Sequence, residues 1–443
     1  MNRVRLRAAV AAGTAALVLA GCGAGGRDSG GSEGAEGDTT GITDSTISIG
    51  THMPLTGVAA PGYSEINTGM KAYFEHVNEQ GGVHGRDIEL SVKDDGYNPT
   101  NTSKVIDELV LKDEVFAILG GLGTPTHSAV VDFLNQEEVP DLFVSSGAQL
   151  WGDDPKERPW TFGWQPDYEI EGKIMGEWIK ENEPDAKVGL FLQGDELGED
   201  GESGLRTYID DQIVERVEYS SGNTDVGPQI AKLKASGADL IVGFNTPSYT
   251  ALSQLVAQKL NYEPTWMYTN VGSDPKLAGS LLSKFSEGQV KGGGALDGVM
   301  TTEYIPGVGE DSPWVDLWQQ VWDEQGGKGE LTNYRIYGMS MAYLFVSALE
   351  ASGEDLTRER IVEVIEKDAQ NWPGPHLAPF RYSEDSHLGI SGMRLVEITG
   401  QKTDPLTDVL VTDLGDAEIT KDPDSAAKAE PGKNGMPEVE VLE

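Results

Sequence analysis

The chain of 443 residues contains a single cysteine, Cys22. One cysteine cannot form a disulfide within the chain, and it excludes metal sites built from several thiolates. Basic residues are also scarce, because 33 lysines and arginines stand against 73 aspartates and glutamates, for a net charge of −40. Such a surface repels nucleic-acid phosphates, so we expect no nucleic-acid partner. The acidic residues are spread along the chain, which is typical of a soluble monomer.

Catalytic motifs are missing as well. The chain has no nucleophile elbow, Walker loop or paired-carboxylate motif, and its six histidines lack metal-ligand spacing. Gly121-x-Gly123 lacks the third glycine of a dinucleotide fingerprint. We therefore expect no enzyme activity, no cofactor and no resident metal. The acidic stretch 195–202 leaves a Ca²⁺ loop open as an alternative to a solvated helix start.

The only long apolar run lies at the N-terminus. Three arginines among the first seven residues precede the apolar segment 8–19, and Leu-Ala-Gly-Cys22 follows. This order is typical of a secretory signal, here residues 1–21, and its ending resembles a bacterial lipobox. That resemblance implies lipid attached to Cys22 and a protein held at the outer face of the cell membrane. The alternative is an ordinary signal peptide with an incidental cysteine.

One stretch, residues 115–148, shows how the fold is built. An apolar strand from Val115 to Leu119 runs into the glycines at 120, 121 and 123, where a backbone can turn tightly. Thr124 precedes Pro125 as expected of a helix N-cap, and a second strand, 139–144, ends in Ser-Ser-Gly. Free backbone N–H groups and hydroxyls then converge on one point, which favours an anion such as a carboxylate.

The same arrangement occurs again 122 residues later. Gly121-Leu-Gly-Thr-Pro aligns with Gly243-Phe-Asn-Thr-Pro, and each follows an apolar strand and precedes a helix. Either copy alone could simply end a strand and begin a helix. Two copies in matching contexts predict two similar lobes with a cleft between them. Strands alternate with helices throughout, so we predict an α/β fold of two doubly wound parallel sheets.

The predicted domain limits follow from this alternation. Residues 22–43 are rich in glycine, serine and acids and predict a flexible, lipid-anchored linker. We place lobe 1 at 44–163 and lobe 2 at 164–300. The chain is expected to return to lobe 1 at 301–376 and to lobe 2 at 377–414. The acidic, proline-punctuated residues 415–443 predict a disordered tail.

Several short motifs, in their order, resemble one family. They are Pro54-Leu-Thr-Gly57, the segment Asn78-Glu-Gln-Gly-Gly-Val-His-Gly85, Asp94-Asp95 with Asn98-Pro99, and Val139-Pro140 leading to Ser145-Ser-Gly-Ala148. The chain resembles type I periplasmic solute-binding proteins of ABC transporters, in the branched-chain amino acid (Leu/Ile/Val)-binding group. The resemblance covers roughly residues 47–411, and the lipobox agrees with a lipoprotein form.

The resemblance implies two lobes joined by three crossing strands that close on a small polar solute, an amino acid or a related carboxylate or amide. It also implies delivery to ABC permease subunits driven by cytoplasmic ATPases. The ligand-binding positions that it implies are Tyr63, Gly123, Thr124, Ser146, Gly147, Ala148, Glu196, Leu197, Asn245, Thr246 and Asn270.

Two of these positions depart from the family pattern. Leu197 stands where amino acid binders carry an aromatic residue, and Asn270 stands where they carry an acid for the ligand's ammonium group. An amide cannot supply that charge-assisted contact. We therefore expect a neutral cleft that does not require an ammonium group, with Asp195 or Glu196 as alternative acids. A sensory role for the same fold is the alternative function. A sensor with this fold would usually be fused to a transmembrane segment. No apolar run long enough to span a membrane follows residue 22, so we favour transport.

Overall fold

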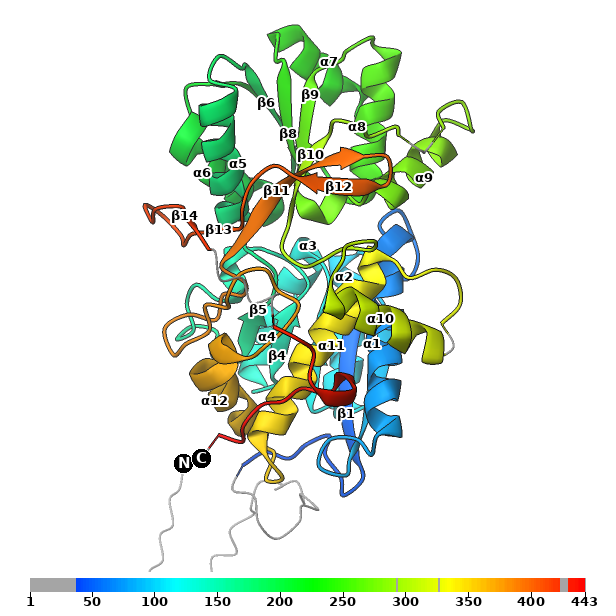
Figure 1. The fold of residues 1–443 in the computed structure, drawn as a ribbon, viewed down its shortest axis with the longest axis vertical. Coiled ribbons are helices and arrows are strands. Elements are labelled where there is room, and N and C mark those ends of the chain that lie inside the picture. The colour runs from blue at the N-terminus through cyan, green and yellow to red at the C-terminus, as the bar shows by residue number, and fades with distance from the viewer. Residues whose placement is uncertain (1–36, 292–293, 326, 423–428, 443) are drawn as a thin grey trace, which may run out of the picture.

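The computed structural model describes residues 37–291, 294–325, 327–422 and 429–442. They form two α/β lobes stacked along the long axis of the molecule (Figure 1). Lobe 1 holds a five-stranded sheet in the order β2-β1-β3-β4-β5. Lobe 2 holds a nine-stranded sheet in the order β14-β13-β11-β10-β9-β8-β6-β7, with β12 paired to β11. The predicted fold class is confirmed.

Lobe 1 is built on parallel strands with helices on both faces. The strands are β1 (Thr46–Met53), β2 (Asp87–Asp94), β3 (Ala117–Leu119), β4 (Asp141–Val144) and β5 (Thr161–Gly163). The helices are α1 (Ala60–Glu79), α2 (Pro99–Leu111), α3 (Thr124–Ser128), α4 (Val131–Gln136), α10 (Pro313–Glu324), α11 (Asn333–Ser352) and α12 (Arg358–Asp368).

Helices α1 and α11 lie side by side on lobe 1 although they are far apart in sequence (Figure 1). Gly69 and Gly338 allow this close approach. A Cβ at Gly69 would lie 2.2 Å from the backbone oxygen of Arg335, and one at Gly338 would lie 2.1 Å from that of Ile66. This contact fixes the N-terminus of α11 beside the region between the lobes.

Lobe 2 combines parallel strands with a late antiparallel set. The parallel strands are β6 (Val188–Gln193), β7 (Ile213–Tyr219), β8 (Leu240–Phe244), β9 (Thr265–Tyr268) and β10 (Met300–Glu303). The antiparallel strands are β11 (Gly392–Thr399), β12 (Lys402–Pro405), β13 (Leu410–Val411) and β14 (Thr420–Lys421). The helices are α5 (Tyr168–Asn182), α6 (Glu196–Ile209), α7 (Gly227–Ser236), α8 (Pro247–Lys259) and α9 (Pro275–Phe285).

The chain passes between the lobes in three segments, 164–167, 304–312 and 372–391. The third differs from the predicted domain limits, because residues 378–382 stay with lobe 1. The Tyr382 hydroxyl donates to the Gly163 carbonyl at 2.6 Å, and the Phe162 and His387 rings stack at 3.7 Å. These aromatic side chains cover the edge strand β5, which would otherwise expose unpaired backbone groups. The return to lobe 2 therefore begins at Gly392, not at residue 377.

The described part of the C-terminal tail is ordered, which corrects the prediction of a disordered segment. Residues 429–442 run along lobe 1 (red in Figure 1). The Tyr73 hydroxyl donates to the Gly435 carbonyl at 2.8 Å, and Trp314 Nε1 donates to the Ala429 carbonyl at 2.8 Å. The Leu442 amide donates to the Ala351 carbonyl at 2.9 Å. Composition alone missed this, because the segment is held by backbone hydrogen bonds together with a few apolar side chains, Met436, Val439 and Leu442, that pack on the core.

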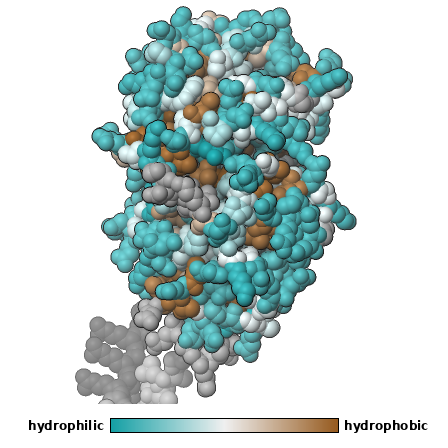
Figure 2. All heavy atoms as spheres, viewed as in Figure 1, coloured by the Kyte–Doolittle hydropathy of each residue, from teal (hydrophilic) through white to brown (hydrophobic). Residues whose placement is uncertain are grey.

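The predicted signal peptide and Cys22 lie outside the described residues. Within the described ranges, no helix is both long enough and apolar enough to cross a membrane. The face in Figure 2 is mostly hydrophilic, as the net charge leads one to expect, and several hydrophobic residues gather where the lobes meet.

Candidate ligand-binding cleft

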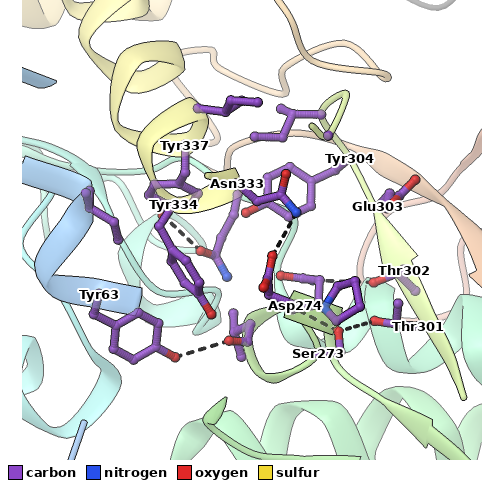
Figure 3. Close-up of a pocket in the computed structure, with 18 of the residues that line it drawn as sticks. Tyr63, Ser273, Asp274, Thr301, Thr302, Glu303, Tyr304, Asn333, Tyr334 and Tyr337 are labelled. Atoms are coloured by element: carbon purple, nitrogen blue, oxygen red, sulfur yellow. Dashed lines mark hydrogen bonds between the residues drawn. The ribbon is translucent and has the colours of Figure 1, made fainter. Parts of the chain in front are cut away.

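A cavity of about 200 Å³ lies between the two lobes. Its wall is formed by strand ends of both sheets, by the first two crossing segments and by the N-terminus of α11. Figure 3 shows Tyr63 and Tyr334 facing Ser273, Asp274 and the residues that follow β10. Ligand sites in open α/β folds form beyond the carboxyl ends of parallel strands, where these residues lie.

The structure divides the eleven ligand-binding positions expected from the sequence into two sets. Those that line the cavity are Tyr63, Gly123, Thr124, Leu197, Thr246 and Asn270. Those outside the lining are Ser146, Gly147, Ala148, Glu196 and Asn245. For all eleven residues, contact with a ligand remains a prediction.

The segment 121–125, which we call the lobe 1 anchor, forms a loop and not the start of a long helix. Gly123, rather than Thr124, occupies the N-cap position, at a φ of 101° that side chains rarely adopt. Helix α3 then runs for only five residues before the chain breaks and α4 begins. Thr124 reaches the cavity with its hydroxyl 2.8 Å from that of Ser146. A helix this short has only a small dipole, so hydroxyl groups provide most of the polarity here.

The remaining lobe 1 positions support this loop from behind. Ser146 is 2 % exposed, and the Gly147 carbonyl accepts the Tyr168 amide at 2.7 Å. Ser145 lines the cavity instead of Ser146. The predicted pair of strand-end hydroxyls is present, but the pleat of the backbone turns the first of them toward the cleft.

The matching segment 243–247, the lobe 2 anchor, leads into a full helix. Thr246 is the N-cap of α8, and its amide donates to the Tyr219 hydroxyl at 3.2 Å. Asn245 points away from the cavity, with Nδ2 donating to Thr250 Oγ1 at 2.6 Å. The two anchors thus share a sequence pattern but differ in local structure.

The acidic stretch 195–202 starts α6 and offers no acid to the cavity. Asp195 is the N-cap, accepting the Leu197 amide at 3.1 Å and Gln193 Nε2 at 2.7 Å. Neither Asp195 nor Glu196 is part of the lining, and the alternative that one of them replaces the missing acid stays a prediction. In the described residues, no group of three or more histidine, cysteine or acidic side chains is placed to hold a metal ion.

A different acid lines the cleft, which corrects the expectation of a neutral wall. Asp274 caps α9 through the Leu277 amide, at 2.7 Å, and accepts Asn333 Nδ2 from lobe 1 at 2.8 Å (Figure 3). Burial raises the pKa of this carboxyl group. The nearby Lys276 pairs with Glu330 instead. Local sequence could not reveal this residue, because it lies beyond the short turn that follows β9.

Two further acids at the cavity are neutralised in part. Arg394 Nη2 lies 2.9 Å from a carboxylate oxygen of Glu303 and 2.7 Å from one of Glu310. One guanidinium group therefore forms ion pairs with two carboxylates. Among the described residues that line the cavity, Lys402 on β12 is the only basic one.

Tyrosines make up much of the wall, and only Tyr63 was expected. The others are Tyr97, Tyr168, Tyr304, Tyr334 and Tyr337. Burial raises the pKa of Tyr168 to about 12, so its hydroxyl stays protonated at neutral pH. Tyr334 and Tyr337 are three residues apart on α11 and share a face of the helix. That spacing was the one available signal, but it is equally typical of a helix packed on a core.

Behind the wall lies a buried carboxyl group, Glu171, on α5. It accepts the Thr269 hydroxyl at 2.6 Å, the Thr302 hydroxyl at 2.5 Å and the Asn270 amide at 2.8 Å. Burial raises the pKa of Glu171. Because Asn270 and Thr302 line the cavity, Glu171 positions two of its polar groups.

Two histidines form a buried chain beneath the lobe 1 anchor. His52 Nδ1 lies 2.8 Å from Asp95, His52 Nε2 lies 2.9 Å from His127, and His127 Nε2 lies 2.8 Å from Asp141. All four side chains are fully buried. A Cβ at Gly121 would lie 2.5 Å from His127 and 2.7 Å from His52, so only glycine fits over this chain. This chain of four side chains joins β1, the residue that follows β2, α3 and β4.

Comparisons with known proteins agree with this architecture. The chain is 25% identical over 204 residues to Leu/Ile/Val-binding protein homolog 3 of Brucella melitensis, which covers 44% of this chain and 53% of that protein. It is 22% identical over 334 residues to homolog 1 of Brucella abortus, covering 72% and 82%. The chain thus spans about half of the first relative and most of the second. Both relatives are named as binding proteins and not as enzymes.

Solved structures show the same fold. A fatty acid ABC transporter substrate-binding protein from Thermomonospora curvata matches with a TM-score of 0.72 at 21% identity, covering 89% of this chain and 96% of that one. A branched-chain amino acid ABC transporter protein from Thermus thermophilus with bound valine matches with 0.71 at 20%, covering 84% and 98%. The family described as periplasmic binding protein matches residues 46–403. The chain therefore belongs to the periplasmic binding protein family, within which its relatives are solute-binding proteins.

Proposed function

We propose that this chain is the extracytoplasmic binding protein of an ABC importer. It is tethered through lipid on Cys22, takes up a small amino-acid-like solute between its lobes and delivers it to membrane permease subunits. The proposal is supported by the cavity between the lobes, whose wall combines polar strand ends with tyrosine side chains. The ABC transporter proteins of the same fold support the delivery step.

The ligand class follows from the charges at the cavity. Asp274 is a half-buried carboxyl group with no ion-pair partner in the described part of the chain, and it faces tyrosine rings. A buried carboxylate is costly unless a positive group compensates it. An ammonium group of the ligand provides that compensation, and aromatic faces stabilise cations further. We therefore favour an amino acid over a deaminated acid, in contrast to the neutral cleft expected from the sequence.

Calorimetry with leucine, isoleucine and valine tests this function. Each amino acid is compared with its 2-oxo acid, which lacks the ammonium group. We expect the amino acids to bind and the 2-oxo acids to be at least about tenfold weaker, since a charge-assisted contact contributes ~1.5–3 kcal/mol. Asp274→Asn should reduce this preference. Equal binding of both series would contradict the assigned ligand class, and no binding of any of them would contradict the function.

A further inference from the structure

Gln165 lies on the first crossing segment, between β5 and α5. It is 3 % exposed and lines the cavity. The backbone on either side of it is held in place. The Trp164 carbonyl accepts the Ile390 amide at 3.0 Å, and Asp167 caps α5 through the Ile170 amide at 2.9 Å. The side chain of Gln165 therefore starts from a fixed position between the two lobes.

The two ends of the Gln165 amide differ. Its Oε1 accepts the Tyr337 hydroxyl at 3.1 Å, whereas its Nε2 has no hydrogen-bond partner within the described ranges. Tyr337 is itself fixed, since its ring packs edge-on against Trp164 at 4.6 Å. The hydrogen bond to Oε1 sets the orientation of the amide. It leaves a buried donor at the wall of an open cavity.

Unpartnered buried donors are rare in folded proteins because each loses its hydrogen bonds to water. We propose that Gln165 recognises a hydrogen-bond acceptor on the ligand, a carboxylate or carbonyl oxygen, through Nε2. The inference rests on the proposed function and adds to it a specificity-determining residue on the connection between the lobes. Gln165 provides the donor and Asp274 the acceptor, so the cavity offers opposite polarities to one ligand.

Gln193 is a matched control for this assignment. It is 1 % exposed, and its Oε1 also accepts a tyrosine hydroxyl, that of Tyr219, at 3.1 Å. Its Nε2, however, donates to Asp195 at 2.7 Å, and Gln193 does not line the cavity. The two glutamines thus share burial and an aromatic partner, and they differ in whether the donor is already used.

The test measures L-leucine and L-leucinamide binding by calorimetry, with the melting temperature recorded without ligand. Gln165→Met should weaken leucine binding about tenfold or more, which corresponds to ~1.4 kcal/mol. Gln193→Met should leave leucine affinity within about twofold and lower the melting temperature more, since it removes the hydrogen bonds of Gln193 to Tyr97, Asp195 and Tyr219. Gln165→Glu should weaken leucine strongly and leucinamide less, because the ligand's amide can donate to the new carboxylate.

The outcomes separate this inference from the proposed function. If the wild-type protein binds leucine and Gln165→Met binds it equally well, the assignment of Gln165 is overturned while the function stands. A lowered melting temperature with unchanged affinity has the same meaning, because Gln165 is then structural. If the wild-type protein binds neither leucine, isoleucine nor valine, the function fails and the role of Gln165 fails with it.

Discussion

Thr124 and Ser146 occupy different places at the cleft although their hydroxyls share a hydrogen bond. Thr124 lines the cavity, whereas Ser146 lies outside the lining and contacts the Thr124 hydroxyl. Thr124→Val should weaken ligand binding by about ten- to a hundredfold, or ~1.5–3 kcal/mol, because it removes a hydroxyl contact to a charged group. Ser146→Ala should weaken binding less. Calorimetry on both single variants and the double variant checks this.

The double variant is the informative one for this pair. If Ser146 acts only by positioning Thr124, the two effects are not additive, and the double variant binds as Thr124→Val does. Additive losses would show that Ser146 contacts the ligand itself. Both variants should stay folded, since each change removes a single oxygen atom or replaces it with a methyl group.

Glu171 yields a second prediction at the residue scale. Its carboxylate accepts three donors, and an amide in its place would turn an N–H group toward one of them. Glu171→Gln should destabilise the fold by ~1–3 kcal/mol and weaken ligand binding, because Asn270 and Thr302 lose their positions. Glu181, exposed on the same helix, supplies the control variant Glu181→Gln. Thermal melts and calorimetry decide, and equal behaviour of the two variants would contradict the positioning role.

At the scale of elements, α6 contacts the short helical turn η1 (Gln149–Trp151) of lobe 1. The carboxylate of Asp200 on α6 accepts the Gln149 amide at 3.0 Å. The pKa of Asp200 is raised to about 7, mainly by burial; the Gln149 amide lowers it, and the nearby acids Asp167, Glu196 and Glu169 raise it. The ordinary value is 3.8. The contact therefore couples the protonation of one carboxyl group to the approach of the two lobes.

The sign of the pH effect follows from this raised pKa. Opening the lobes exposes Asp200 and returns its pKa toward the ordinary value, so the closed form binds more protons between about pH 4 and pH 7. Ligand affinity should accordingly fall as pH rises through this range, by up to about tenfold per unit, and then level off. Asp200→Asn should flatten the profile, and Glu199→Gln, at an exposed position on α6, should not. A profile unchanged by Asp200→Asn would contradict the coupling.

At the scale of the whole molecule, the two lobes contact each other around the cavity. Asn333 bonds Asp274, the Ser248 hydroxyl donates to the Val58 carbonyl at 2.8 Å, and the Tyr63 hydroxyl donates to the Val271 carbonyl at 3.3 Å. These three hydrogen bonds are only partly buried, so they can break when the lobes separate. The three crossing segments keep the lobes connected throughout.

Hinge closure is therefore testable by small-angle scattering. Saturating ligand should lower the radius of gyration, because ligand binding favours the closed form. Combining Ser248→Ala with Asn333→Ala should raise the radius of the unliganded protein and weaken binding. A profile that neither ligand nor the double substitution changes would show a rigid cleft.

Membrane tethering is tested separately from ligand binding. The sequence Leu-Ala-Gly-Cys22 predicts lipid attachment at Cys22. Cys22→Ala should move the protein out of the membrane fraction or stop its maturation, as fractionation and blotting would show. Normal processing with continued membrane attachment would refute the lipid anchor. Affinity for ligand should not change, since the linker precedes the first strand.

The sequence alone determined what depends on local order. Alternating strands and helices predicted the α/β class, and the resemblance to a known family implied that Thr124, Thr246 and Asn270 lie at the cleft. Local patterns also identified the family through motifs spread over most of the chain. They missed the pleat that turns Ser145 rather than Ser146 toward the cavity.

Only the tertiary structure decided which distant residues meet. Gln165, Asp274 and Tyr337 come from a crossing segment, a helix cap of lobe 2 and a helix that returns to lobe 1. Each looks locally like a turn, a cap or a packed helix face. Their meeting depends on how the lobes stack, which no local pattern encodes. The same holds for the tail, whose backbone pairs with lobe 1 although its composition predicted disorder. Burial and charge at the cleft are properties of that stacking, and they decide which ligand it can hold.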